Sequence, residues 1–249
     1  MKKIGIISGD ERYAYAKNYF VENGYDATIV KNGIVADADV IILSVRDELS
    51  DTQLEKVFFE SKKYAVVFSG NKKRIERFYD GFVCDYSESE RFVIENAYLT
   101  AEAALVLTRQ LSKKSLLGEK AFVIGYGRIG KFLAEMLKNS GCEVYVYARR
   151  ESSVCDAALH GAKYAPLDSI ATGKYSFVYN TVPQKIVPKS VTDAAAPGIL
   201  TIELASEEGG FEDENYAVRA PGLPGRILPE SAGRAVYKTI ADILSKVII

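Results

Sequence analysis

The sequence predicts an α/β fold made of two domains, each built on a parallel sheet. Three observations predict it. Strand-like apolar runs alternate with helical patterns through all 249 residues, which is typical of parallel strands covered by helices. A Gly-x-Gly-x-x-Gly turn, from Gly125 to Gly130, follows one apolar run and opens a helical segment. The Ala- and Leu-rich segment 96–112 contains neither Gly nor Pro and predicts one long helix that connects the two domains.

The first domain is predicted to comprise residues 1–95 and to be a smaller, flavodoxin-like α/β unit. Its strands are expected at 3–8, 27–30, 40–43, 65–68 and 81–85, and its helices at 12–22, 51–61 and 72–78. The first strand ends at Gly9-Asp10, a turn that leads into a helix but lacks the Gly-x-Gly-x-x-Gly spacing. We therefore expect this domain to bind a different ligand, the substrate.

The second domain, residues 96–229, is predicted to be a C-terminal Rossmann domain that binds NAD(P). Its strands are expected at 120–124, 143–147, 163–165, 177–180, 199–203 and 217–220. A final helix is expected over 230–247, where apolar residues recur at helical spacing: Val236, Ile240, Ile243, Leu244 and Val247. In two-domain dehydrogenases of this plan the last helix often returns to the first domain, so residues 230–249 are assigned to that domain.

The glycine turn predicts a dinucleotide site, because its context is strand, turn and helix. Gly125 allows the tight turn, Gly127 lets the backbone approach a pyrophosphate, and Gly130 lets helix and strand pack closely. The pyrophosphate is expected on the N–H groups at the start of the helix, at Arg128 and Ile129. An ordinary strand-to-helix turn is the alternative.

Two arginines at the end of the second strand of this domain indicate which dinucleotide binds. An NAD site normally has Asp or Glu at that point, to bind the ribose 2′-hydroxyl, whereas Arg suits the 2′-phosphate of NADP. Here Arg149 and Arg150 stand there, and no carboxylate occurs before Glu151. A guanidinium matches a phosphate in geometry and charge. The sequence therefore predicts NADP as the cofactor, the alternative being two solvated surface arginines.

Later strand exits of the second domain are expected to complete the cofactor and substrate sites, because ligands bind at the carboxyl ends of parallel strands. The fourth strand leads into a segment expected against the nicotinamide ribose, and Gly- and Pro-rich loops are expected to form the floor of the nicotinamide pocket. The residues assigned to the cofactor are Asn180, Thr181, Val182, Pro183, Gly222 and Pro224, and Ser206 is assigned to the substrate. Turn formation alone is the alternative for these loops.

Residues of the first domain and of the connecting helix are candidates for substrate binding and catalysis. Asp10 and Arg12 lie at a helix start, where Arg12 could bind a substrate carboxylate; a capping Asp beside a solvated Arg is the alternative. Ser69 and Gly70 lie at another strand exit and could donate to a carboxylate. Glu102, in the connecting helix, is the candidate proton acceptor, and a solvent-facing glutamate is its alternative.

Composition excludes several classes. The net charge of −1 gives no support for nucleic-acid or membrane-surface binding, and no segment approaches the ~20 apolar residues of a membrane helix. The single histidine, His160, is expected at an exposed helix end, which disfavours an imidazole metal site and a histidine acid/base. Cys84, Cys142 and Cys155 are expected to be buried free thiols of a cytoplasmic protein.

Taken together, these segments resemble the A-subunit family of dipicolinate synthase. The resemblance covers residues from about 96 to the C-terminus and also the opening Gly9-Asp-Glu-Arg12, with Ser8 where the family pattern has Gly. The rest of the first domain departs from the pattern and is expected to be shorter than in the family. The motifs are Thr100-Ala-Glu102-Ala, Gly125-Tyr-Gly-Arg128-Ile-Gly130, Ala148-Arg149, Asn180-Thr-Val-Pro183, Glu203-Leu-Ala-Ser206 with Gly209-Gly210, and Ala220-Pro-Gly-Leu-Pro-Gly225 with Pro229 and Ala232-Gly233.

The resemblance implies that a dihydrodipicolinate-type ring, bound between the domains, is oxidised to pyridine-2,6-dicarboxylate with NADP⁺ as hydride acceptor. Positioning groups then matter more than a strong acid or base. The implied partners are a small dicarboxylate substrate and a second, flavoprotein-like subunit; a homodimer is a further assembly to consider. Two alternatives stay open: another NADP-dependent oxidoreductase of a small carboxylate or imine, and a non-catalytic dinucleotide-binding scaffold or sensor.

Overall fold

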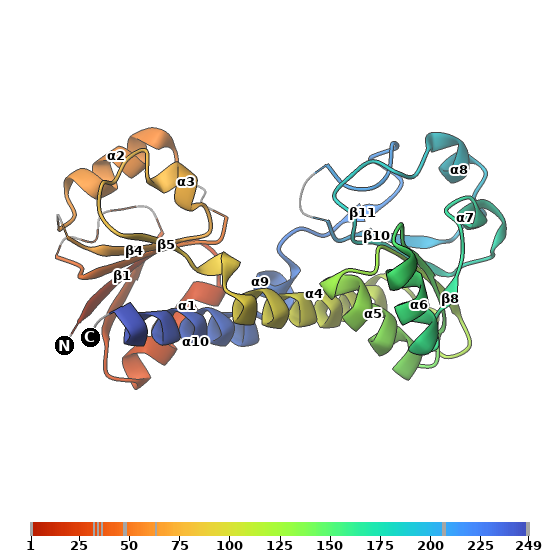
Figure 1. The fold of residues 1–249 in the computed structure, drawn as a ribbon, viewed down its shortest axis with the longest axis horizontal. Coiled ribbons are helices and arrows are strands. Elements are labelled where there is room, and N and C mark those ends of the chain that lie inside the picture. Colours follow the sequence, from red (N-terminus) through yellow and green to blue (C-terminus); the bar gives the residue numbers. More distant parts are fainter. Residues whose placement is uncertain are drawn as a thin grey trace. The chain divides into compact units, whose positions relative to one another are not determined.

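The structure, a computed structural model, describes residues 2–31, 33, 35, 37–46, 49–62, 64–205 and 208–247, with the backbone alone at 247. The chain forms two compact units (Figure 1), one made of Met1–Asn96 with Pro224–Ile249 and the other of Ala97–Leu223. The last segment thus joins the first unit from Pro224 onward, whereas residues 224–229 were expected in the nucleotide-binding domain. The reason is the packing of Gly225, where a Cβ would lie 2.5 Å from Nη2 of Arg12.

The first unit contains one parallel sheet of flavodoxin type. Its strands are β1 (Lys3–Ile7), β2 (Asp26–Val30), β3 (Val40–Leu43), β4 (Val66–Ser69) and β5 (Val83–Asp85). They pair in the order β2-β1-β3-β4-β5, all parallel. This order confirms the flavodoxin-like prediction and places the point where the strand order reverses between β1 and β3.

Helices cover both faces of this sheet (Figure 1). α1 (Arg12–Glu22) and α10 (Pro229–Val247) lie on one face, and α2 (Asp51–Phe59) and α3 (Lys72–Ile75) lie on the other. β3 shows how the sequence fits this arrangement. Val40 and Ile42 belong to the apolar core shared with α1 and α10, whereas Ile41 and Leu43 belong to the core shared with α2 and α3. A strand buried on both faces is apolar at every position, as β3 is.

The final helix, α10, completes the core of the first unit. Its buried residues Val236, Ile240 and Leu244 share a core with Phe20 of α1. Tyr237 adds an edge-to-face contact with Phe20, with ring centroids 5.0 Å apart. The apolar spacing seen in the sequence is therefore the face that α10 buries. A short 3-10 helix, η1 (Tyr86–Glu88), and a short helix, α9 (Leu223–Ile227), are the remaining elements near this unit.

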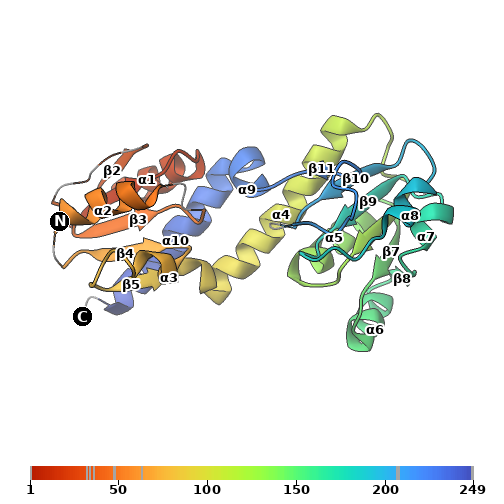
Figure 2. The ribbon, with the colours of Figure 1, turned by 90° about the horizontal axis from the view of Figure 1, so that it is seen from above.

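The second unit contains a six-stranded parallel sheet of Rossmann type (Figure 2). Its strands are β6 (Lys120–Ile124), β7 (Glu143–Tyr147), β8 (Lys163–Tyr164), β9 (Phe177–Asn180), β10 (Leu200–Glu203) and β11 (Val218–Arg219). They pair in the order β11-β10-β9-β6-β7-β8. In the order of the chain this is the arrangement 6-5-4-1-2-3, with the reversal between β6 and β9, which confirms the predicted Rossmann domain.

The connecting helix, α4 (Glu90–Leu111), begins at Glu90, earlier than the expected residue 96, and runs from the first unit into the second. The Thr108 hydroxyl, 2.8 Å from the Tyr179 hydroxyl, joins it to β9. The other helices of the second unit are α5 (Arg128–Asn139), α6 (Glu151–Leu159), α7 (Ser169–Thr172) and α8 (Lys189–Asp193).

The cysteines differ from expectation in one respect. Cys142 is buried, Cys84 is half-buried, and Cys155 is exposed on α6, so the prediction of buried thiols is wrong for Cys155. Burial raises the pKa of the Cys142 thiol to about 11. His160 is exposed just after α6, as predicted.

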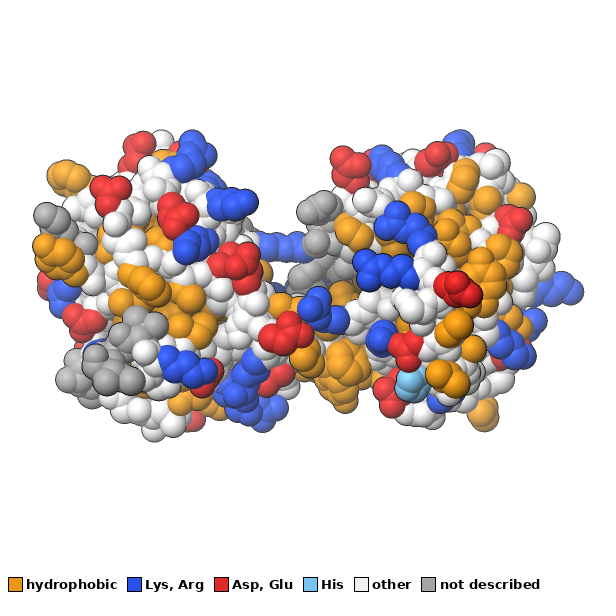
Figure 3. Space-filling model, viewed as in Figure 1, with side chains coloured by type: hydrophobic (Ala, Val, Ile, Leu, Met, Phe, Trp, Pro, Cys, Tyr) orange, Lys and Arg blue, Asp and Glu red, His pale blue; other side chains and the backbone are white. Residues whose placement is uncertain are grey.

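The surface carries charges of both signs. On the face drawn in Figure 3, acidic and basic side chains lie interspersed on both units, in keeping with the net charge of −1. Within the described part of the chain, the helices are too short or too polar to cross a lipid bilayer.

Candidate functional site

The glycine turn after β6 lies at the reversal point of the second sheet, where the ends of β6 and β9 are neighbours. Gly125 adopts a left-handed φ of 95°, and a Cβ there would overlap the side chains of Thr181 and Val182. A Cβ on Gly130 would overlap the carbonyl oxygen of Gly125. Both glycines are therefore required by the packing of the chain itself, in agreement with the roles predicted for a tight turn and a close helix–strand contact.

Gly127 differs from its two neighbours in the motif. Its φ of −82° suits any residue, it is exposed, and a Cβ there would meet no atom within 4 Å. The chain's own packing thus gives no reason for glycine at this position, and open space lies where a ligand would approach the backbone. No side chain caps the N-terminus of α5, where Arg128 and Ile129 stand, and the Lys131 N–H donates to Gly127 O at 2.9 Å. These residues fit the pyrophosphate of a dinucleotide.

Arg149 and Arg150 follow β7 beside the glycine turn. The Gly125 N–H donates to Tyr147 O at 2.8 Å, which joins the turn to the last residue of β7. Both arginines are exposed. Exposed guanidinium groups at this edge could bind the phosphate of a dinucleotide ribose.

The exit of β9 is shaped by the buried side chain of Asn180. Its Nδ2 donates to Val182 O at 2.8 Å, and its Oδ1 accepts from the Val182 N–H at 3.1 Å. Thr181 Oγ1 donates to Ile124 O at 2.9 Å, which fixes this exit against β6. The Asn180 amide is thus used within the protein, while Thr181 and Val182 are half-buried and Pro183 is exposed at the edge.

A buried carboxylate, which stands out in the sequence only as part of the 203–206 motif and without an assigned role, holds the neighbouring loop. Glu203, at the end of β10, is 3% exposed and accepts hydrogen bonds from the N–H groups of Ala205 (2.9 Å) and Gly210 (2.8 Å). Asn180 Nδ2 donates to both of its oxygens, so within the described residues the Glu203 carboxylate is held by N–H groups. A glutamate closing the apolar run Leu200–Glu203 was the available signal. Ser206, assigned to the substrate, lies outside the described residues.

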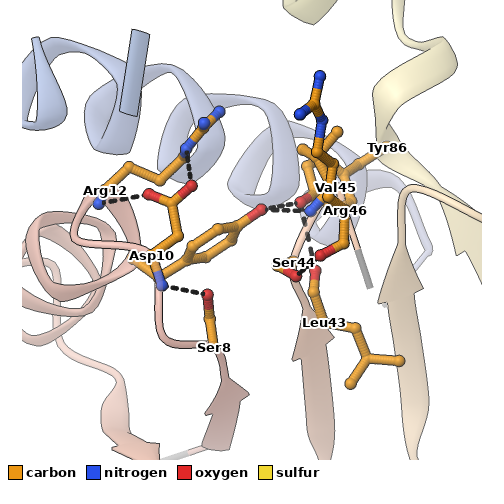
Figure 4. Close-up of polar contacts among 9 residues, drawn as sticks. Ser8, Asp10, Arg12, Leu43, Ser44, Val45, Arg46 and Tyr86 are labelled. Carbon is orange, nitrogen blue, oxygen red and sulfur yellow. Dashed lines mark hydrogen bonds and ion pairs between the residues drawn. The ribbon is translucent and has the colours of Figure 1, made fainter. Parts of the chain in front are cut away.

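The edge of the first sheet holds the Asp10–Arg12 pair (Figure 4). Arg12 is 7% exposed, its Nε lies 2.9 Å from Asp10 Oδ2, and its backbone N–H donates to Asp10 Oδ1 at 3.0 Å. Ser8 Oγ accepts from the Asp10 N–H at 3.1 Å. The Asp10 carboxylate thus accepts from the first N–H of α1, although the N-cap residue is Glu11, and Arg12 is buried rather than solvated as the alternative interpretation had it. Its terminal nitrogens donate to no group within the described residues.

Two buried tyrosines hold the turn after β3. The Val45 N–H donates to the Tyr13 hydroxyl at 2.7 Å, Tyr13 and Tyr86 are hydrogen-bonded through their hydroxyls, and the Tyr86 hydroxyl donates to Leu43 O at 3.2 Å. Burial raises the pKa of Tyr13 to about 12 and that of Tyr86 well above its ordinary value. Sequence reasoning did not single out either tyrosine.

The remaining predicted residues are distributed over both units. Ser69 is buried, and its hydroxyl accepts from the Asn71 N–H at 3.0 Å. A Cβ on Gly70 would overlap the backbone of Val45. Both residues therefore determine the path of the chain after β4.

Glu102 is half-buried on α4 in the second unit, and within the described part of the chain its carboxylate accepts no hydrogen bond.

The last two predicted cofactor residues lie on either side of the boundary between the units. Gly222 has a left-handed φ of 67° with open space beside it. Pro224 is buried in α9 and belongs to the first unit.

Comparison with known proteins relates the nucleotide-binding part of the chain to a family of dehydrogenases. Residues 87–193 match the NAD binding domain of D-isomer specific 2-hydroxyacid dehydrogenases. The chain is 27% identical over 169 residues to the dipicolinate synthase A-subunit of Bacillus subtilis (strain 168), an alignment that covers 64% of this chain and 57% of that protein. The aligned part therefore spans little more than half of the curated relative.

Two solved structures share the whole fold. The crystal structure of the dipicolinate synthase A-subunit from Bacillus halodurans matches with a TM-score of 0.81 at 21% identity and covers 98% of each chain. That of its counterpart from Bacillus subtilis matches with a TM-score of 0.78 at 22% identity, over 98% of this chain and 96% of the other. The chain is related in sequence and fold to the dipicolinate synthase A-subunit, and it carries a nucleotide-binding domain of the 2-hydroxyacid dehydrogenase type.

Proposed function

We propose that the chain is an NADP-dependent dehydrogenase that oxidises a dihydrodipicolinate-type ring to pyridine-2,6-dicarboxylate. Gly127 is the main support for dinucleotide binding. A Cβ at this position would meet no atom of the protein within 4 Å, so the need for glycine is explained by a ligand that approaches the backbone there. The relation to the dipicolinate synthase A-subunit supports the choice of substrate. The proposal assigns the second unit to the cofactor and the first unit to the carboxylates of the substrate.

The residues of the second unit would hold the dinucleotide as follows. The N–H groups at the start of α5 bind the pyrophosphate, and Arg149 and Arg150 bind the 2′-phosphate that distinguishes NADP from NAD. The loops fixed by Asn180 and Glu203 line the nicotinamide end. When bound, the oxidised dinucleotide supplies the hydride acceptor.

The residues of the first unit would position the ring. Arg12 is held by Asp10 through Nε, which leaves its terminal nitrogens for one carboxylate of the substrate. Because the product is aromatic, the protein has mainly to orient the ring and exclude competing reactions. A strong acid or base is not needed, which agrees with the exposed position of the single histidine.

Glu102 is the proposed acceptor of the proton that leaves the ring, with a water molecule as the alternative. A Glu102→Gln variant separates the two, because glutamine cannot accept the proton. If Glu102 is the base, kcat falls by roughly 10²- to 10⁴-fold while the affinity for NADP⁺ stays the same. A change of only a few-fold assigns the proton to water.

The direct test is an assay of the purified chain with dihydrodipicolinate and NADP⁺, alone and with a candidate flavoprotein-like second subunit. The readouts are the absorbance of the reduced nicotinamide and the chromatographic yield of pyridine-2,6-dicarboxylate. Product under either condition supports the proposal, and its absence under both contradicts it. Light scattering of the same samples tests a homodimer against assembly with the second subunit.

The match to the 2-hydroxyacid dehydrogenase domain favours one alternative, an NADP-dependent oxidoreductase of another small carboxylate or imine. Hydride transfer to such compounds, without pyridine-2,6-dicarboxylate formation, would identify it. A scaffold or sensor would instead bind NADPH without any turnover, and that binding would survive both Arg12→Ala and Glu102→Ala.

A further inference from the structure

Arg46 lies at the same edge of the first sheet as the Asp10–Arg12 pair. β1 and β3 are paired, with Ile7 opposite Leu43, so the loops that follow them start side by side. These are also the strands between which the strand order reverses, and in open parallel sheets ligands bind at that point. Figure 4 shows the side chains of Arg12 and Arg46 extending in the same direction, beyond the ends of the strands.

The turn that carries Arg46 is fixed from three elements. Tyr13 of α1 accepts from the Val45 N–H, and Tyr86 of η1 donates to Leu43 O. After β4, Gly70 lies so close to Val45 that a side chain would overlap its carbonyl oxygen. The Ser44 hydroxyl donates to the carbonyl oxygen of Arg46 itself. The backbone of Arg46 is therefore held before any ligand arrives, which lowers the entropic cost of binding.

Arg46 and Arg12 differ in charge environment. Arg12 is buried and paired with Asp10, so the pair together is close to neutral. Arg46 is exposed, and among the described residues no carboxylate lies within ion-pair distance of its guanidinium. A dianionic ligand at this edge would need a second positive charge besides Arg12. Arg46 supplies it, in a planar form that can bind a carboxylate through two N–H groups.

We propose that Arg12 and Arg46 form a two-arginine site across the β1/β3 edge, in which Arg46 binds the second carboxylate of a dicarboxylate. The inference rests on the proposed function, since it names the group that selects a dicarboxylate over a monocarboxylate in that site. Arg12 would bind either class of ligand, whereas Arg46 would contribute only when the ring carries two carboxylates.

The test compares two probes by isothermal titration calorimetry on the full chain, in buffer free of divalent cations because both probes chelate such ions. The probes are pyridine-2,6-dicarboxylate and pyridine-2-carboxylate. The wild-type protein should bind the dicarboxylate about 10- to 100-fold more tightly, the range expected for one charge-assisted hydrogen-bonded pair. Arg46→Gln should lose that preference while its affinity for the monocarboxylate stays unchanged. Arg46→Lys should keep part of it.

Arg77→Gln is the matched control, because Arg77 is an exposed arginine of the same unit and lies 3.7 Å from Asp51, which also pairs with Arg74. Its preference should equal that of the wild type, and thermal unfolding of each variant verifies the fold. If Arg46→Gln keeps the wild-type preference, the two-arginine site is overturned while the proposed function stands. If the wild type binds neither pyridine carboxylate, the proposed substrate itself is wrong and the site falls with it.

Discussion

Asn180 Nδ2 donates to both carboxylate oxygens of Glu203, at 2.8 and 3.0 Å, and so links the ends of β9 and β10. Both side chains are almost fully buried, and Glu203 also holds Ala205 and Gly210 through their N–H groups. One carboxylate thereby fixes two of the loops assigned to the nicotinamide end of the cofactor.

Replacing Glu203 by Gln should destabilise the second unit. The amide NH₂ of glutamine would face an N–H donor whichever way it is placed, so one buried donor loses its acceptor at a cost of about 2–3 kcal/mol. Urea unfolding measures the change. Glu214→Gln removes a carboxylate that is paired with Lys185 at the surface and should leave the midpoint almost unchanged. Equal effects of the two substitutions would contradict the role assigned to Glu203.

Two glycine-to-alanine substitutions in the same motif should affect different properties: one should weaken cofactor binding and the other should lower stability. Gly127→Ala enters open space, so it should change stability by less than ~0.5 kcal/mol and yet weaken NADP(H) binding by about tenfold or more. Gly130→Ala overlaps the Gly125 carbonyl oxygen, so it should cost more than ~2 kcal/mol of stability. Thermal unfolding and fluorescence titration with NADPH measure both. Unchanged NADPH affinity in Gly127→Ala would remove the main support for the dinucleotide site.

Arg149→Asp should change the choice between the two dinucleotides. The carboxylate repels a 2′-phosphate but can accept from a ribose 2′-hydroxyl, so NADPH affinity should fall on the order of 10- to 100-fold while NADH affinity changes little. Parallel titrations with the two cofactors give the ratio. An equal loss of affinity for NADPH and NADH would show that Arg149 does not bind the 2′-phosphate.

The tyrosine pair predicts a loss of stability in alkali. Burial raises the pKa of Tyr13 from its ordinary 10.0 to about 12, so the neutral form is favoured in the folded state. The contribution of neutral Tyr13 to the free energy of unfolding is complete below pH 10. It declines as the pH rises from 10 through 12, because the unfolded chain then releases a proton that the folded chain retains. Urea unfolding at a series of pH values measures the decline. Tyr13→Phe should make it less steep, whereas Tyr164→Phe, at an exposed position, should not.

The sequence predicted most of the fold because the relevant patterns are local. An apolar run such as Val40–Leu43, buried on both faces, leaves little choice but an inner parallel strand. The glycine turn has a fixed spacing, and the structure gives the predicted reason for Gly125 and Gly130 in their contacts with Thr181 and with each other.

What the sequence could not show depends on partners distant in the chain. Arg12 is buried because α9, more than two hundred residues later in the chain, packs against it at Gly225. The sequence around Arg12 contains no pattern that predicts this contact. Tyr13 and Tyr86 meet only once the sheet has formed. In the sequence Glu203 is simply the last residue of a strand. Its role depends on four N–H contacts, two of them with Asn180 on another strand, which only the folded structure brings together.

The return of α10 to the first unit has a consequence for synthesis. Residues 1–96 leave the ribosome before residues 97–223, yet part of their core comes from Val236, Ile240 and Leu244, which are synthesised after both segments. Residues 97–223 are continuous in the chain and can fold as soon as they emerge. The first unit therefore finishes folding after the second, and until α10 has emerged the apolar face of α1, with Phe20, stays exposed to chaperones and proteases.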